Sequence, residues 1–109
     1  MILSLALAAA AVTARHDIVI LSSVETSDFV KQCEGAPTDL SGNFCVGYIM
    51  GAYDELALTR LICAPGSGAT TLAAVAATRK YLSDHPEQWS QHTSAIVRRA
   101  LQATFPCHR

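Results

Sequence analysis

The side chains of this chain with the most distinctive chemistry are its four cysteines, Cys33, Cys45, Cys63 and Cys107. They form no C-x-x-C pair and no cysteine and histidine cluster with zinc-finger spacing, which argues against a redox-active dithiol and against a metal site. An even number of well-separated cysteines in a small chain is instead typical of structural disulfides formed in an oxidising compartment. We therefore expect two disulfides, no metal and no cofactor.

The carboxylates and histidines do not form a catalytic pattern. Asp54 and Glu55 are neighbours in the sequence, so on a helix they point about 100° apart and cannot converge on one substrate atom as a catalytic pair does. The sequence has no nucleophile elbow, no phosphate-binding loop and no zinc-protease motif. The histidines are scattered along the chain, at His16, His85, His92 and His108. The sequence therefore predicts no catalytic residues, and we do not expect an enzyme.

These polar residues have structural interpretations instead. His85 precedes Pro86 and is expected in a turn, and Pro65 is expected in the turn after the second helical segment. His92 is expected on a helix surface. Asp54 is expected to act as a polar anchor that hydrogen-bonds to the third or fourth helix.

Proline and glycine residues divide the chain after residue 25 into four segments with helical periodicity. The expected helices run over about 26–34, 43–62, 70–83 and 90–105. Serine or threonine before the first segment, and Thr70 or Thr71 before the third, are expected as N-caps. Because 50% of the residues are hydrophobic, a packed core is favoured over disorder. The predicted fold class is all-α, a compact bundle of about four helices stapled by two disulfides.

The second segment has apolar residues on nearly every side, which predicts a buried helix in the middle of the protein. Gly47 and Gly51 lie four residues apart in this segment, and their missing side chains would allow another backbone to approach closely. Because Asp54, Glu55 and Arg60 are also present, we expect a packing notch in a soluble protein rather than a membrane dimer motif.

The last two segments each have one apolar stripe. The residues of the third segment expected in the core are Leu72, Val75, Ala76 and Leu82. Those of the fourth are Trp89, Thr93, Ile96, Val97, Ala100, Leu101 and Thr104. Pro106 cannot continue the helix, so Cys107 is expected in a short tail.

Helix geometry limits how the cysteines can pair. Cys45 and Cys63 lie at opposite ends of the second expected helix, about 27 Å apart at about 1.5 Å per residue. A disulfide requires Cα atoms within about 7 Å, so this pair is excluded. Cys33 ends the first helix and Cys45 begins the second, so a helical hairpin brings them together. We predict Cys33 paired with Cys45, and Cys63 paired with Cys107; a crosslink between Cys45 and Cys107 would contradict this assignment.

The N-terminal residues have the composition of an export signal. Residues 1–14 are mostly aliphatic residues and alanine, end in Val-Thr-Ala, and are too few to span a bilayer, which requires about 20 apolar residues. We predict a signal peptide over residues 1–14, an N-terminal arm over 15–25, and a periplasmic helical domain over 26–109. Residues 18–21 of the arm are Ile-Val-Ile-Leu, and both a short strand and an extended arm fit this run.

The charges are few and unevenly distributed. The formal net charge is -1 at pH 7, and nothing resembles the dense basic stripe of a nucleic-acid-binding protein. Acidic residues prevail up to residue 55, and basic residues prevail from residue 60 onward. Two interpretations remain: the two halves attract each other within the fold, or the acidic half binds a basic partner.

A series of short motifs runs through the domain in a fixed order. They are Asn43-Phe44-Cys45-Val46-Gly47-Tyr48-Ile49-Met50-Gly51-Ala52-Tyr53-Asp54, Ile62-Cys63-Ala64-Pro65, Tyr81-Leu82-Ser83-Asp84-His85-Pro86-Glu87, Ala100-Leu101 and Phe105-Pro106-Cys107. The series resembles the Rap/Tai family of type VI secretion immunity proteins, which marks 26–109 as a Rap/Tai-like immunity domain. The resemblance implies a small helical periplasmic protein with disulfides that binds and inhibits a secreted peptidoglycan amidase effector. The glycine-rich turn at 66–68 and the run at 18–21 depart from the family pattern.

An inhibitor of this kind needs an exposed loop or helix end that enters the enzyme's groove. Two connections are candidates, the turn that contains Ser67 and the connection that contains Gln88 and Trp89. Trp89 also has an interpretation as a core residue at the start of the fourth helix, which the sequence favours. Two other functions remain as alternatives, a small periplasmic chaperone or stress protein and an orphan helical domain without a toxin partner. A homodimer is compatible with the sequence, although no feature requires it.

Overall fold

A computed structural model of the chain describes residues 17–35, 44–63 and 70–108. Over these ranges the chain forms helices and no strand. The elements follow in the order α1 (Thr26–Gln32), α2 (Phe44–Leu58), α3 (Thr71–Asp84), the 3₁₀ helix η1 (Pro86–Gln88) and α4 (Thr93–Thr104). The predicted all-α fold with four principal helices is confirmed.

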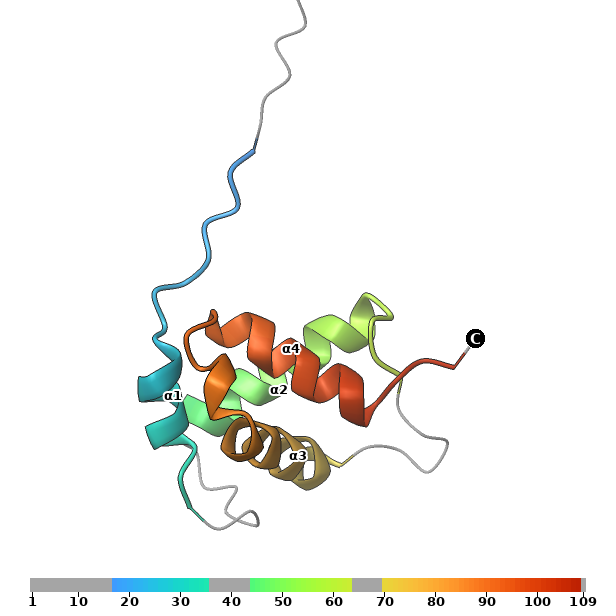
Figure 1. Cartoon of the computed structure of the whole chain (residues 1–109). Helices are drawn as coiled ribbons and strands as arrows, with labels where there is room; N and C mark the ends of the chain where they lie inside the picture. The colour runs from blue at the N-terminus through green and yellow to red at the C-terminus, as the bar shows by residue number, and fades with distance from the viewer. Residues whose placement is uncertain (1–16, 36–43, 64–69, 109) are drawn as a thin grey trace, which may run out of the picture.

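The helices form a bundle in which α4 packs against both α2 and α3 (Figure 1). α2 also packs against α3, and α1 lies at one end of the bundle, where it contacts α2. Residues 17–24 leave this end as an extended segment that runs away from the helices (Figure 1). Among the helices described, none is both long enough and apolar enough to cross a membrane.

The core is built from side chains of all four α-helices and of the segments that follow α2 and α4. Its members are Phe29, Cys33, Cys45, Ile49, Leu56, Ile62, Ala74, Val75, Leu82, Ile96, Val97, Leu101 and Phe105. Aromatic rings gather where α1 meets α2: the Phe29 ring lies 4.9 Å from Tyr48 and 6.2 Å from Phe44, measured between ring centroids. Burial of these apolar side chains is the main stabilising contribution to the bundle.

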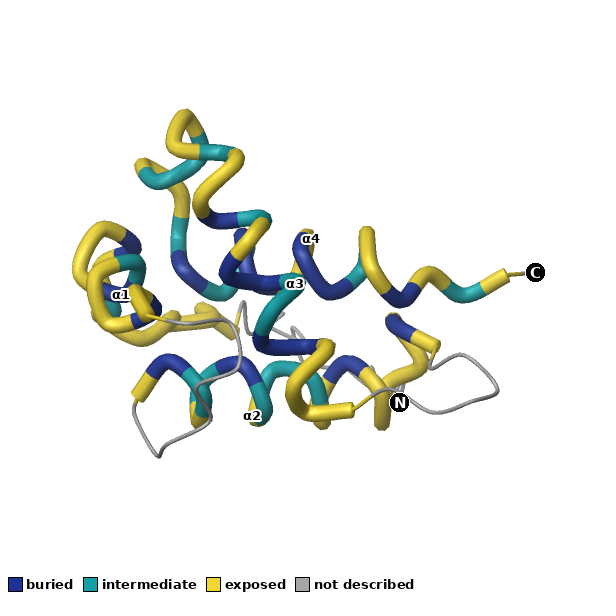
Figure 2. The backbone as a smooth tube through the Cα atoms, turned by 90° about the horizontal axis from the view of Figure 1, so that it is seen from below, coloured by how far each residue is buried: buried dark blue, intermediate teal, exposed yellow. Residues whose placement is uncertain are grey.

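α2 is an outer helix with one buried side, which corrects the prediction of a helix buried on all sides. Its buried residues are Cys45, Ile49 and Leu56. Figure 2 shows the buried side of α2 turned toward the other helices and an exposed side turned outward. A bundle of four short helices has too little volume to surround any one of them, so even an apolar helix stays partly exposed.

The exposed side of α2 carries Gly47, Gly51 and Asp54. Apart from the adjacent residues and the backbone of α2 itself, no described atom lies within 4 Å of the place where a Cβ would stand at either glycine. The predicted close approach of another backbone is therefore absent in this part of the chain. Asp54 does not make the predicted hydrogen bond to α3 or α4, because it lies on the outer side of α2.

α2 ends at Leu58 rather than at the predicted residue 62, because a Schellman motif stops it. The N–H of Leu61 donates to the carbonyl of Leu56 at 2.9 Å, and the N–H of Arg60 donates to that of Ala57 at 3.1 Å. Arg60 has a φ of 59°, the left-handed conformation that the motif requires at this position. The chain then turns back toward the C-terminal end of α4.

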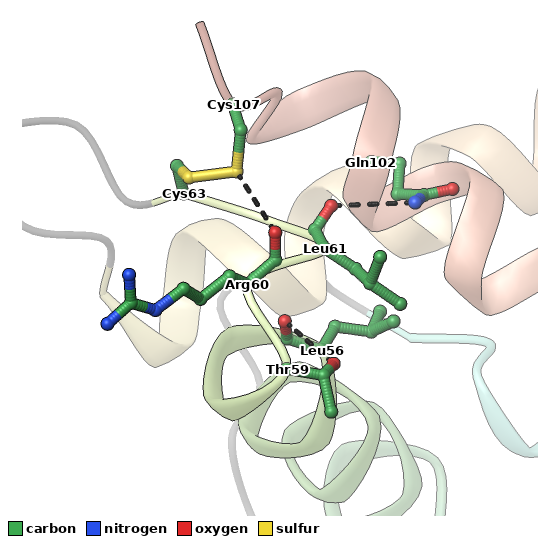
Figure 3. Close-up of a disulfide and its surroundings, with 7 residues drawn as sticks. All are labelled: Leu56, Thr59, Arg60, Leu61, Cys63, Gln102 and Cys107. Carbon is green, nitrogen blue, oxygen red and sulfur yellow. Dashed lines mark hydrogen bonds between the residues drawn. A yellow bond between two sulfur atoms is a disulfide. The ribbon is translucent and has the colours of Figure 1, made fainter. Parts of the chain in front are cut away.

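Both predicted disulfides are present. The Cα atoms of Cys33 and Cys45 are 5.1 Å apart, and those of Cys63 and Cys107 are 4.8 Å apart. Beside the second disulfide, the N–H of Cys63 donates to the carbonyl of Phe105 at 2.9 Å. The oxidised sulfur of Cys107 lies 3.6 Å from the carbonyl oxygen of Arg60 (Figure 3). The second disulfide therefore joins the chain after α2 to the chain after α4.

The start of α3 agrees with the prediction, whereas that of α1 does not. The Thr70 hydroxyl accepts from the N–H of Ala73 at 3.1 Å, so Thr70 is the predicted N-cap. α1 begins after Glu25, whose side chain makes no cap hydrogen bond, so the predicted serine or threonine cap is wrong. α1 also ends at Gln32, two residues before the predicted end, and Cys33 follows it as the C-cap.

α4 begins at Thr93, three residues after the predicted start. Its N-cap is His92, and residues 86–88 form η1 instead of continuing into the helix. The predicted apolar stripe of α4 is buried at Thr93, Ile96, Val97, Ala100 and Leu101, but Trp89 is half-buried and Thr104 is exposed. On α3 the predictions hold for Val75 and Leu82, whereas Ala76 is half-buried and Leu72 is exposed.

Candidate partner-binding site

The connection between α3 and α4, residues 85–89, is held in place by side-chain contacts. α3 ends at His85, and Pro86 begins η1. The His85 ring stacks on the Tyr81 ring at a centroid separation of 4.0 Å, and its Nδ1–H donates to the carbonyl oxygen of Tyr81 at 2.8 Å. His85 thus lies in the turn that was expected before Pro86, and its ring closes the last turn of α3.

Gln88 and Trp89 complete this connection. The side-chain Oε1 of Gln88 accepts from the Tyr81 hydroxyl at 3.2 Å and from the Arg99 guanidinium at 3.1 Å. The indole N–H of Trp89 donates to the carbonyl of Leu82 at 2.9 Å, and its half-buried ring packs against the core. Trp89 therefore packs one part of its ring against the core and leaves another part exposed.

The other predicted site residues lie elsewhere. Gly47, Gly51 and Asp54 are on the exposed side of α2. Pro65 and Ser67 lie outside the described residues. Of the residues proposed to contact a partner, the structure therefore places Gln88 and Trp89, and it places them side by side.

An open groove between α2 and α4 could not be predicted from the sequence. Its lining consists of Leu21, Gly47, Tyr48, Gly51, Ala52, Glu55, Leu56, Ser94, Ala95, Arg98, Arg99 and Gln102. The glycines leave space at the α2 wall, because a Cβ at either position would meet nothing described within 4 Å. Most of the lining is apolar, with Glu55 on the α2 wall and the two arginines on the α4 wall. The spacing of Gly47 and Gly51 was the available sequence signal, but it does not reveal which helix faces them.

His92 holds the start of α4 and the base of the N-terminal arm together. Its Nδ1 accepts from the N–H of Ser94 at 3.1 Å, and its Nε2–H donates to the carbonyl of Ser22 at 2.7 Å. This role was missed, because the prediction placed His92 on the surface of a helix. Histidine is not among the residue types preferred as N-caps, so its type alone could not indicate the role.

Two buried threonines fix the chain on either side of Val24. The Thr93 hydroxyl donates to the carbonyl of Val24 at 3.0 Å, and the Thr26 hydroxyl donates to the carbonyl of Gln91 at 2.6 Å. The two hydroxyl oxygens are 3.0 Å apart. Together with His92, these bonds attach α1 and the base of the arm to the start of α4.

The charged and titratable groups with perturbed pKa values lie outside this connection. Lys80 pairs with Asp84 on the exposed side of α3 at 2.6 Å, and the hydrogen bond from Lys80 lowers the pKa of the Asp84 carboxyl. Burial in the groove raises the pKa of the Tyr48 hydroxyl, and a hydrogen bond with Ser94 partly offsets this effect. Within the described ranges, no group of three or more histidine, cysteine or carboxylate side chains is placed to hold a metal ion.

The fold and these surfaces define a small, disulfide-linked, all-α protein with the features of a binding protein. The chain matches the family model of the Rap1a immunity proteins over residues 25–107, and it belongs to this family. Membership assigns it an immunity role that involves a cognate type VI effector, in a family that is generally non-enzymatic. Comparisons with curated proteins and with solved structures gave no match.

Proposed function

We propose that this protein is a periplasmic immunity protein that binds a type VI secreted peptidoglycan amidase and blocks its active site. The observation that carries the proposal is the family match over residues 25–107, a range that includes all four cysteines. The amidase as effector comes from the resemblance of the sequence motifs to the Rap/Tai family.

The periplasm is supported by two features of the chain. Both cysteine pairs form disulfides, which persist in oxidising compartments and are rare in the cytosol. Residues 1–14 have the composition of a signal peptide. An enzyme that hydrolyses peptidoglycan acts outside the inner membrane, so its inhibitor has to be exported to meet it.

The proposed contact surface is the connection at residues 85–89. Gln88 is half-buried, and Trp89 offers the exposed part of an aromatic ring, the residue type most enriched among interface anchors. Both side chains are already held by hydrogen bonds, so binding would require little additional ordering. Ser67, which lies outside the described residues, remains a proposed contact residue.

A titration with a cognate amidase tests the proposal. The protein is added in increasing amounts to the amidase encoded by a neighbouring gene, and release of peptide from peptidoglycan is measured. We expect activity to vanish near a stoichiometric ratio and a complex to appear in size-exclusion chromatography. Full activity in excess protein, together with equal killing of cells that contain or lack the protein, would rule out the immunity role.

Export is tested separately. N-terminal sequencing of the protein recovered from the periplasm is expected to begin near Arg15. A chain that retains Met1 and fractionates with the cytoplasm would contradict the proposed location. This outcome would leave the family assignment unchanged.

A small periplasmic chaperone is the second candidate function. It is favoured by the exposed aliphatic side chains of residues 18–21, because chaperones bind unfolded clients through exposed apolar surface. The two functions differ in specificity. A chaperone would suppress aggregation of unrelated unfolded proteins, whereas an immunity protein would bind its effector and leave such aggregation unchanged.

A further inference from the structure

We propose that the disulfide between Cys63 and Cys107 is a site of reversible thiol–disulfide exchange in the folded protein, at which the thiolate of an external reductant attacks Cys63. The disulfide between Cys33 and Cys45 is closed to such attack while the bundle is folded. The inference goes beyond the proposed function, because it involves neither an effector nor residues 85–89. It rests on the unequal burial of two disulfides in one small bundle.

The two disulfides differ in their access to solvent. Cys33 is 6% exposed and Cys45 is 0% exposed, and both belong to the hydrophobic core. Cys63 is exposed and Cys107 is half-buried. A thiolate must reach a sulfur atom to exchange with it, so a disulfide in the core reacts only when the structure around it opens. The second disulfide can therefore react while the four helices stay packed.

Exchange at the second disulfide takes two steps when the reductant is a dithiol. A thiolate of the reductant attacks the sulfur of Cys63, the more exposed cysteine, and the S–S bond breaks with its electron pair on the sulfur of Cys107. The second thiol of the reductant, once deprotonated, attacks the reductant sulfur of this mixed disulfide and displaces the Cys63 thiolate. The two thiols of the reductant become one disulfide, and the two cysteine thiolates take up the two protons that the reductant released.

The structure provides a hydrogen-bond acceptor for the reduced form of Cys107. The sulfur of Cys107 lies 3.6 Å from the carbonyl oxygen of Arg60 (Figure 3). A disulfide sulfur carries no hydrogen, whereas a thiol is a weak donor, so this carbonyl gains a donor only when Cys107 is reduced. The reduced state therefore has a contact that the oxidised state lacks.

Contacts other than the disulfide keep the two cysteines together after reduction. The N–H of Cys63 donates to the carbonyl of Phe105, two residues before Cys107, at 2.9 Å. Ile62 and Phe105 are 3% and 6% exposed, and the Phe105 ring lies edge-on to the Tyr53 ring at a centroid separation of 5.7 Å. These contacts hold the two thiols at a high effective concentration. Oxidation should therefore restore the same pair.

Timed reduction of the folded protein tests the proposal. The native protein is treated with dithiothreitol, samples are alkylated at intervals, and mass spectrometry of the peptides measures labelling of each cysteine. We expect labelling of Cys63 and Cys107 at least tenfold faster than that of Cys33 and Cys45, with the helical circular dichroism signal retained while only the second pair is labelled. Labelling of all four cysteines at one rate, earlier labelling of Cys33 and Cys45, or loss of helix as the second pair opens would each overturn the proposal.

The same reduction in concentrated urea is the control for burial. Both disulfides are accessible in the unfolded chain, so we expect their reduction rates to agree within about threefold. A tenfold difference that persists in urea would overturn burial as the cause of the selectivity.

Glutathione tests the sulfur attacked and the reversibility. It has one thiol, so its mixed disulfide with the protein can be trapped by rapid acidification, and we expect the adduct on Cys63. After the reductant is replaced by glutathione disulfide, we expect the bond between Cys63 and Cys107 to return. An adduct confined to Cys107, or oxidation into crosslinks between molecules, would overturn the proposal. No effector enters these experiments, so failure of the proposed immunity function would not alter their results.

Discussion

The imidazole Nε2–H of His92 donates to the carbonyl oxygen of Ser22 at 2.7 Å, across 70 positions of the sequence. The other ring nitrogen accepts from the N–H of Ser94 and caps α4. In these two bonds Nε2 is the donor and Nδ1 is the acceptor. One side chain therefore determines both where α4 begins and where the N-terminal arm is attached.

Replacing His92 by alanine is expected to remove both effects. Loss of the cap lowers the free energy of unfolding by about 1 kcal/mol, which for a domain of this size corresponds to a fall in Tm of about 4–8 °C. Thermal unfolding followed by circular dichroism measures the change. His92→Asn is the matched control, because asparagine caps a helix but is too short to reach Ser22. The asparagine variant should have the Tm of the parent, whereas its amide hydrogen exchange near Ser22 should stay as fast as in the alanine variant. An alanine variant with the same Tm as the parent would contradict the capping role.

Arg60→Gly is expected to raise stability. Arg60 holds a positive φ at the end of α2, a conformation that costs a non-glycine residue on the order of 1 kcal/mol and costs glycine almost nothing. The carbonyl at this position is retained, so its contact with Cys107 is unchanged. Urea unfolding should show a gain of about 0.5–1 kcal/mol, after allowance for the greater freedom of glycine in the unfolded chain. Arg60→Lys serves as the control, and a glycine variant no more stable than this control would show that the turn is not strained.

The two disulfides are expected to contribute unequally. The sequence separation is 12 residues for Cys33 and Cys45 and 44 residues for Cys63 and Cys107. By loop entropy, removal of the first pair costs about 3 kcal/mol and removal of the second costs about 4 kcal/mol. Paired serine substitutions and urea unfolding measure both values. Equal losses would show that native-state contacts, such as the bond between the Cys63 N–H and the Phe105 carbonyl, outweigh loop length.

Gln88→Ala is expected to weaken effector binding at least tenfold while the fold remains intact. The substitution removes a half-buried amide at the proposed contact surface, at a cost in stability of about 1 kcal/mol for its bonds to Tyr81 and Arg99. Isothermal titration calorimetry with the cognate amidase measures the affinity. Gln91→Ala also removes a hydrogen-bond partner of Arg99 but lies outside η1, so it is the control. Equal affinities for both variants would remove residues 85–89 from the contact surface.

The ion pair on α3 predicts a pH dependence of known sign. The hydrogen bond from Lys80 lowers the pKa of Asp84 below its usual value of 3.8, so the folded state favours the ionised carboxylate. This contribution is present above pH 3.8 and is lost as the pH falls through the lowered pKa. Because the pair is exposed, salt should weaken it. An NMR titration of the Asp84 carboxyl should shift upward with Lys80→Met, and identical titration curves would contradict the pairing.

Local patterns were sufficient for the helices and the cysteine pairing. Helical periodicity, together with proline and glycine between the segments, indicated four helices, because a helix needs an apolar face and those residues interrupt it. The length of one helix excluded a bond between Cys45 and Cys63, and the expected hairpin of the first two helices then favoured Cys33 with Cys45. Thr70 or Thr71 was predicted as an N-cap from residue type, and the structure shows that it is Thr70.

Helix ends and the burial of α2 required the tertiary structure. The Schellman turn at Arg60 contains no glycine, so its residue types do not signal it. The apolar composition of α2 predicted a buried helix. Burial also depends on how many other helices pack against it, and a small bundle has too few to cover every side.

The sequence by itself determined the helical class, the disulfide framework and the family resemblance, because each depends on residue types at fixed spacings along the chain. Only the tertiary structure decided which surfaces are available for binding. The groove beside Gly51 exists because the packing of α2 with α4 leaves open space at this glycine, and the arm is anchored because His92 meets Ser22 across 70 residues. Contacts of this kind depend on the packing of whole helices, which no local pattern of residues encodes.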